Sequence, residues 1–167
     1  SVNLSSSFTG TGNVWSTSAT TDNINISAVG NYNIDVTYTD GNGCSATSLP
    51  TSVTVNALPV TPVITASGPT TFCFGNSVDL SSSSIGGNTW STGALSDNIN
   101  ISAVGVYTID VTQTDGNGCS TTSAPITVTV NALPAVPVIT ASGPTTFCFG
   151  NSVNLSSSFT GTGNVWS

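Results

Sequence analysis

The sequence predicts an all-β protein made of tandem antiparallel β-sandwiches, one in each repeated segment of the chain. Three observations lead to this fold class. Short runs alternate β-branched with polar residues, no run shows the period of a helix, and glycine, asparagine and proline separate the runs. Many short strands that are closed by tight turns are typical of β-sandwiches.

The chain repeats most of its own length. The segment FCFGNSV begins at Phe72 and again 75 residues later at Phe147, and the segment that begins at Ser1 recurs from Ser152. Solenoid repeats are shorter, at roughly 20 to 50 residues, so a repeat of this length suits one small domain. We therefore expect a section of a longer tandem array, in which the neighbouring repeats are the first partners of each unit.

Proline-rich stretches mark the expected boundaries. LPVTP begins at Leu58 and LPAVP begins at Leu133, and such spaced prolines favour an extended, semi-rigid connector. Division at these points predicts a partial unit at 1–58 that lacks its first strand, a complete unit at 59–133, and the N-terminal part of a third unit at 134–167.

The first half of a unit contains three expected strands. Pro137–Ala141 predicts the first of them, with its proline at the strand start, where a missing N–H is tolerated. In Ser77–Ser81, Val78 and Leu80 fall on one face. A short strand at Gly87–Trp90 follows.

The second half of a unit contains longer alternating runs. These runs are Asn98–Ser102, Val106–Thr112 and Pro125–Asn131. Their β-branched residues recur with a period of two, which indicates strands with one buried face. The turn Asp115–Gly118 is expected to close the last hairpin, because Asp-Gly is a strong hairpin signal.

Differences between the two copies support these faces. Asn3, Asn31 and Asn33 are replaced by Asp79, Val106 and Thr108, and all of these positions are expected to face outward. The expected inward positions are unchanged, because a packed core restricts substitution. The predicted core of the complete unit consists of Val78, Leu80, Trp90, Tyr107, Ile109 and Val111.

The composition excludes several classes of function. The chain has no Lys, Arg, His, Glu or Met, and its formal net charge is −7. Cations are needed to neutralise phosphates, so we expect no nucleic-acid partner. No run of about 18 apolar residues exists for direct insertion into a membrane. We expect no enzyme and no catalytic residue, because the abundant serine has no base beside it.

The four cysteines predict a structural disulfide in an oxidising compartment. We pair Cys73 with Cys119 inside the complete unit, where the bridge would add roughly 4 kcal/mol. Cys44 and Cys148 would then pair with cysteines outside this segment. Free thiols, or a bridge from Cys44 to Cys73 across the linker, are the alternatives.

The motif order resembles the immunoglobulin-like repeats of very large secreted adhesins of gliding and surface-colonising Bacteroidota, the SprB type. A proline-rich start, FCFGNSVDLSSSS, a lone Trp90, DNINISAVGVYTIDVT and TDGNGC follow one another along the whole unit. Gly105-Val106-Tyr107 is similar to the Gly-x-Tyr that opens strand F of immunoglobulin domains, although the cysteines lie outside the usual core positions. The resemblance implies an immunoglobulin-like sandwich, export through the outer membrane, and extracellular display on an anchored fibre.

Two groups of residues are candidate binding sites. Trp15, Trp90 and Trp166 occur once in each unit and could stack on sugars, although we expect core residues. Asp97, Asp115 and Asn117 are weak candidates for calcium ligands. The turn at 115–118 contains one carboxylate only, so a plain hairpin is favoured, and we expect no cofactor.

The favoured function is therefore that of stalk or spacer modules in a long cell-surface adhesin filament for surface attachment or gliding. One alternative is a carbohydrate-binding module that grips surface polysaccharide with avidity from repetition. Another is self-association with sister chains into a sheath or filament.

Overall fold

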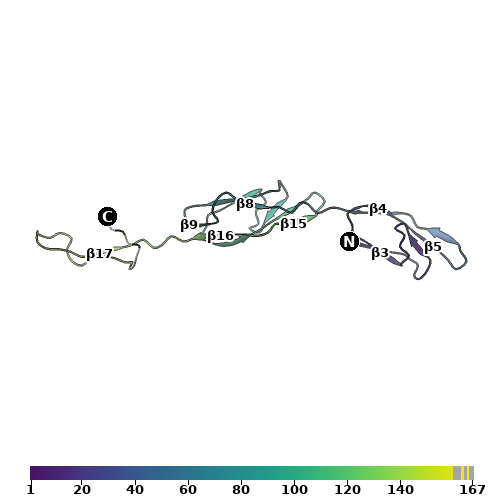
Figure 1. The fold of residues 1–167 in the computed structure, drawn as a ribbon, viewed down its shortest axis with the longest axis horizontal. Coiled ribbons are helices and arrows are strands. Elements are labelled where there is room, and N and C mark those ends of the chain that lie inside the picture. Colours follow the sequence, from purple (N-terminus) through teal and green to yellow (C-terminus); the bar gives the residue numbers. More distant parts are fainter. Residues whose placement is uncertain (160–162, 164, 166–167) are drawn as a thin grey trace.

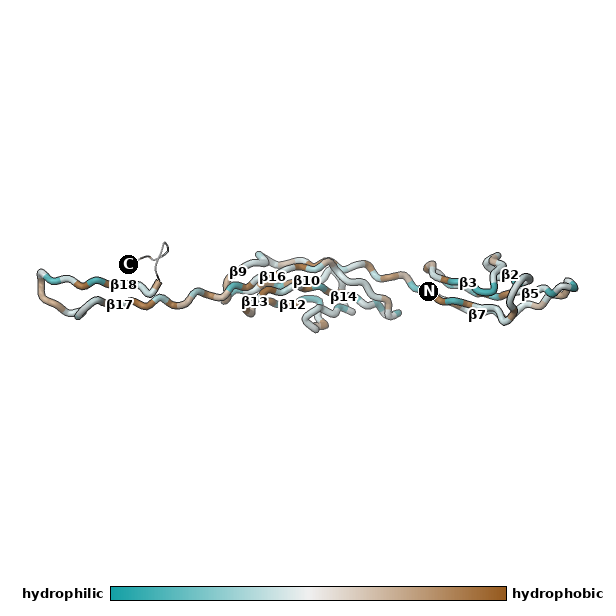
Figure 2. Tube along the Cα trace, turned by 90° about the horizontal axis from the view of Figure 1, so that it is seen from below, coloured by the Kyte–Doolittle hydropathy of each residue, from teal (hydrophilic) through white to brown (hydrophobic). Residues whose placement is uncertain are grey.

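The computed structural model describes residues 1–159, 163 and 165, so that Trp166 lies outside the described residues. The described residues form strands, turns and loops. Figure 1 shows three units in line, joined by single extended segments, and Figure 2 shows the same elongated arrangement from a second side. We call residues 1–58, 59–133 and 134–167 the first, second and third units. Within the described part of the chain, no helix has the length and apolar character needed to cross a bilayer.

The strands follow the repeat. The first unit has β1 (Val2–Ser5), β2 (Asn13–Trp15), β3 (Asn23–Ile26), β4 (Gly30–Ile34), β5 (Val36–Thr39), β6 (Ser45–Thr47) and β7 (Thr51–Val55). The second unit has β8 (Ile64–Ala66), β9 (Thr71–Cys73), β10 (Val78–Ser82), β11 (Asn88–Trp90), β12 (Asn98–Ile101), β13 (Gly105–Ile109), β14 (Val111–Thr114), β15 (Ser120–Thr122) and β16 (Ile126–Asn131). The third unit has β17 (Ile139–Ala141) and β18 (Leu155–Ser157).

The second unit is a two-layered β-sandwich with an immunoglobulin-like arrangement. One layer has the strand order β12-β10-β8. The other layer has the order β13-β16-β9 and continues as β11-β14-β15, because β13 passes into β14 at Asp110 and β15 passes into β16 through 123–125. β9 pairs with β16 in parallel, and the remaining strand pairs of this unit are antiparallel.

A break at Asp110 separates β13 from β14, where the sequence predicts one continuous strand over Val106–Thr112. The N–H of Asp110 donates to Ser91 Oγ at 3.1 Å. On the other side of the break, the N–H of Val111 donates to Ser123 Oγ at 3.1 Å. Serine hydroxyls therefore replace strand partners at this point, which lets the layer change direction without an unpaired N–H.

The core of the second unit is a thin apolar layer between the two sheets. Its buried members are Val78, Leu80, Trp90, Ile101, Ile109, Val111, Val128 and Val130. Leu80 is 0% exposed and Trp90 is 1% exposed. Tyr107, which the sequence places in the core, is half-buried and packs against this cluster from its edge.

The position of Tyr107 is fixed by its hydroxyl. The Tyr107 hydroxyl donates to the carbonyl of Ala103 at 3.1 Å, and the Tyr32 hydroxyl donates to Ala28 in the same way at 3.0 Å. A Cβ at Gly105 would lie 3.1 Å from the Tyr107 hydroxyl, at a φ of +155° that side chains rarely adopt. This arrangement is the tyrosine corner of immunoglobulin sandwiches, and it explains the Gly-x-Tyr motif.

The first unit has the same plan with a more open interior. Its core cluster consists of Trp15, Ile26 and Ile34. Val2 is 38% exposed, whereas its counterpart Val78 is 1% exposed. In the second unit β8 and β9 cover this region, and the given sequence begins after the positions that correspond to these two strands.

The sequence missed two short strands, β9 and β15. Neither TFC nor STT shows the alternation on which the expected strands were based. The strand predicted at Pro137–Ala141 begins two residues later, at Ile139. Both missed strands lie at the ends of the sandwich, where pairing with a neighbour rather than sequence pattern decides the conformation.

Truncation of Leu80 tests the core. We expect Leu80→Ala to lower the free energy of unfolding of the second unit by about 3 kcal/mol, because it leaves a cavity in a closed site. The matched control Leu95→Ala removes a side chain that is 75% exposed and should change stability by less than about 0.5 kcal/mol. Urea titration followed through the Trp90 indole N–H signal in NMR spectra measures both. Equal effects of the two variants would contradict this description of the core.

Candidate functional site at the junction between units

Asp97 and Asn88 form a hydrogen-bonded clamp that holds the loop between β10 and β11. Asp97 Oδ1 accepts the N–H of Gly86 at 2.9 Å and the Asn88 Nδ2 at 2.8 Å. Asn88 is 2% exposed, and its amide also binds Ser84 O at 2.8 Å and Ser82 Oγ at 3.1 Å. The buried amide is therefore fully satisfied.

The same clamp recurs in the first unit. Asp22 Oδ1 accepts the N–H of Gly10 at 2.8 Å and the Asn13 Nδ2 at 3.2 Å. The carboxylate is thus used inside the fold, where Asp22 and Asp97 each hold the loop that precedes their tryptophan strand. Sequence reasoning missed this clamp, although an asparagine two residues before Trp15 and before Trp90 was a visible signal.

The other calcium candidates, Asp115 and Asn117, build a turn. Asp115 Oδ1 accepts the N–H of Asn117 and the N–H of Cys119, both at 2.9 Å. Asp40 makes the same contacts in the first unit, where the N–H groups of Cys44 and then Asn42 lower its pKa. Within the described residues, no group of three or more His, Cys, Asp or Glu side chains comes together to hold a metal ion.

Trp15 and Trp90 are part of the core. Trp90 Nε1 donates to Ser96 O at 2.7 Å, and Trp15 Nε1 donates to Thr21 O at 2.7 Å. With Trp90 1% exposed and Trp15 4% exposed, neither presents a ring face on which a sugar could stack.

The junction between the first and second units is a short connector, residues 56–62, that is anchored at its second proline. Pro62 is among the fully buried side chains. Thr121 Oγ1, on β15, lies 3.4 Å from the carbonyl oxygens of both Pro59 and Val60. The connector therefore runs along β15 before it becomes β8, and residues 59–62 are held against the second unit.

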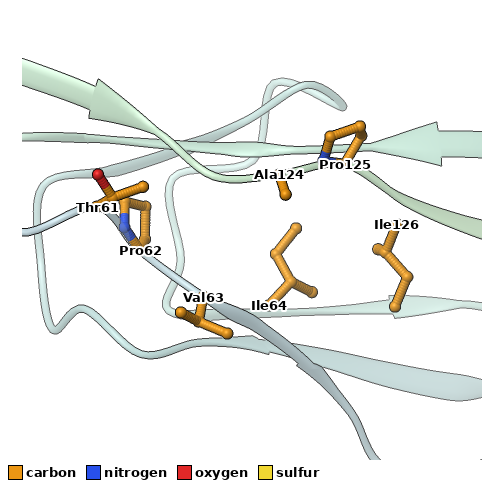
Figure 3. Close-up of a pocket in the computed structure, with 7 residues that line it drawn as sticks. All are labelled: Thr61, Pro62, Val63, Ile64, Ala124, Pro125 and Ile126. Carbon is orange, nitrogen blue, oxygen red and sulfur yellow. The ribbon is translucent and has the colours of Figure 1, made fainter.

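A groove of about 430 Å³ lies where the connector meets the sandwich. In Figure 3, Pro62 and Ile64 from the incoming chain face Ala124 and Pro125, which join β15 to β16, and Ile126, the first residue of β16. Its walls are almost entirely apolar side chains, with no charged group. The groove offers no set of converging polar groups for a ligand, and we interpret it as part of the joint.

The cysteines contradict the predicted bridge between Cys73 and Cys119. All four cysteines are free thiols. Cys73 lies opposite Asn131 at the end of β16, next to the connector to the third unit. Cys119 follows the β14–β15 turn at the other end of the sandwich, beside the connector from the first unit.

The distance between Cys73 and Cys119 has a simple cause. β16 spans six residues, which is about 20 Å at ~3.3 Å per residue, and a disulfide needs Cα atoms within about 7 Å. The alternative bridge from Cys44 to Cys73 is absent as well. The in-unit pairing was wrong because it assumed that two cysteines of one unit are neighbours, whereas β9 carries Cys73 to the far end.

The chain is similar to a solved structure of fibronectin(III)-like modules from Clostridium thermocellum CbhA. The match covers 78% of this chain and 84% of the other, at 17% sequence identity and a TM-score of 0.37. No family model matches the chain, and no curated protein matches it. The strand pairing described above defines the fold.

Removal of the clamp amide should destabilise the second unit. We expect Asn88→Ala to lower its free energy of unfolding by about 2 kcal/mol, because the Asp97 carboxylate and the Ser84 carbonyl lose a buried donor. The matched control is Asn98→Ala, at an exposed position of β12, which should have an effect below about 0.5 kcal/mol. Addition of calcium should not restore the stability of Asn88→Ala. Restoration by calcium would show that the site is a metal site after all.

The turn at Asp40 should titrate below the ordinary range of aspartate. The folded state lowers the Asp40 pKa because its carboxylate accepts the N–H groups of Cys44 and Asn42. This contribution to stability is present above the unfolded pKa and is lost as the pH falls through the lowered, folded pKa. Carboxyl ¹³C titration of the native chain, compared with the chain in urea, measures the shift. An Asp40 pKa that is the same in both states would contradict the turn geometry.

Proposed function

We propose that these units are structural stalk or spacer modules of a long adhesin filament of the SprB type, used in surface attachment or gliding. The filament would be extracellular and anchored at the cell surface, and the modules would have no enzymatic activity. The observation that carries the proposal is the arrangement of the units in line (Figure 1), in which the first and second units each have their own strands and core.

Separate cores support a role in which the units add length to a filament rather than bind a ligand. The two core clusters share no residue, and every pair of strands in substantial contact belongs to a single unit. Each unit can therefore be added to or removed from an array without loss of a shared interior. Near-identical units suit a spacer, since a spacer needs length and not a distinct surface on each module.

The charge pattern supports an extended thread. The seven carboxylates of the chain face no Lys, Arg or His, so neighbouring units have no ion pairs that would fold one unit back on another. Like charges repel at low ionic strength, and the joint between the first and second units is held at Pro62. Both effects favour a chain that stays long.

The carbohydrate-binding alternative has lost its main candidate residue. Trp90 is enclosed in the core, so its removal would unfold the unit rather than abolish a sugar contact.

A sheath built from sister chains predicts self-association, whereas a single-chain stalk predicts a monomer. Sedimentation equilibrium distinguishes these two outcomes.

Small-angle X-ray scattering tests the stalk proposal. We expect a radius of gyration of about 30 Å for the chain, roughly twice the ~15 Å of a compact globule of this length. Replacement of residues 57–61 by a longer Gly/Ser segment should reduce the radius of gyration, because a flexible linker lets the units approach each other. A compact particle for the unmodified chain would overturn the proposal.

A further inference from the structure

The parallel pairing of β9 with β16 places one thiol at the trailing end of the second unit. In this register Cys73 lies opposite Asn131, and the N–H of Phe74 donates to Asn131 O at 2.8 Å. The Cys73 side chain is exposed. Asn131 is the last residue of β16, so this thiol stands beside the start of the connector to the next unit.

The repeat gives the equivalent place in the first unit. Asn56 is the counterpart of Asn131, 75 residues earlier, and Ser1 is the counterpart of Ser77. Cys73 precedes Ser77 by four residues. In a unit that has its β9-type strand, the corresponding cysteine would therefore precede Ser1 by four residues and would lie beside Asn56.

That place is a groove in the structure. A groove of about 550 Å³ is lined by Ser1, Val2, Leu4, residues 51–56 and Cys119. Cys119 belongs to the second unit, and the remaining lining residues belong to the first. In the second unit the corresponding space is covered by β9, whose Phe72 packs against the core. The groove is thus the position at which a β9-type strand would pack, and Cys119 lies at the edge of this position.

We infer that the Cys73-type thiol of each unit forms a disulfide with the Cys119-type thiol of the following unit. A paired strand lies about 4.8 Å from its neighbour, so a cysteine opposite Asn56 would stand next to the groove wall to which Cys119 contributes. A disulfide requires Cα atoms about 4.4 to 6.8 Å apart, which neighbours in a groove of this size can reach. This inference deepens the proposed stalk function and rests on it.

The same pairing between successive units explains why Cys73 and Cys119 are free in this chain. The partner of Cys73 would lie in the β14–β15 type hairpin of the third unit, and the printed sequence stops before that hairpin. The partner of Cys119 would precede Ser1. The bond forms when two thiols give up two protons and two electrons to a disulfide oxidant such as oxidised glutathione, which becomes two thiols.

The consequence for a stalk is a covalent clamp across each joint. The clamp would close a loop around the connector of residues 56–62, because one thiol precedes the connector in the chain and the other follows it. Bending at the joint would then be limited by the bond as well as by the buried Pro62. A pull on the fibre would load two covalent paths in parallel at each junction.

The experiment places residues 72–76 (FCFGN) directly before Ser1 in the full chain, which supplies the missing cysteine. After oxidation with glutathione at low protein concentration, we expect the free thiols to fall from five to three. Chymotryptic peptides, needed because the chain has no trypsin sites, should show the added cysteine joined to Cys119. A bond from the added cysteine to Cys44, Cys73 or a second chain, or five remaining thiols, would overturn the inference.

Matched variants locate the bond. Cys119→Ser in the extended chain should abolish the bridge, and Cys44→Ser, which alters the same hairpin position in the first unit, should leave it intact. Scattering of the reduced, unextended chain tests the stalk proposal independently, so failure of the bridge and failure of the stalk are distinguishable. The unextended chain should keep four free thiols under the same oxidation, whereas the in-unit bridge predicts two.

Discussion

The structure depends on one thin apolar layer that each unit buries between two small sheets. Leu80, Val111 and Val128 are completely enclosed, and they reach that state because alternate residues of β10, β14 and β16 face the same interior. No helix covers either sheet in the described part of the chain. A unit of about 75 residues buries a limited share of its surface, so nearly every inward side chain is needed.

The absence of cations forces the carboxylates to find other partners. Asp97 is held by the Asn88 amide, and Asp79 accepts from the Asn100 amide at 2.7 Å. Asp40 and Asp115 are held by the N–H groups of their own turns. Asparagine and backbone amides thus take the place that lysine and arginine have in most proteins. Each of these hydrogen bonds has one charged partner only, so it is less sensitive to salt than a surface ion pair.

The sequence predicted the sandwich and most of its interior, because alternation directly reports which face of a strand is buried. The faces of Val78, Leu80, Ile109 and Val111 followed from this rule. The rule could not predict the short strands β9 and β15, since three residues are too few to show a period. The cysteine partners could not be predicted either. Their positions depend on the parallel pairing of β9 with β16 and on the joint between units, and neither of these leaves a local pattern in the sequence.

The pairing of β9 with β16 has a mechanical consequence. The incoming connector leads through β8 into β9, and β16 leads into the outgoing connector, so tension that passes β8 pulls the two parallel strands past each other along their common axis. The bonds from Thr129 N to Thr70 O at 2.7 Å and from Phe74 N to Asn131 O at 2.8 Å would be sheared together. Unzipping would break such bonds one at a time, whereas shear has to rupture them all at once. The second unit therefore resists stretching through the short parallel pairing of β9 with β16.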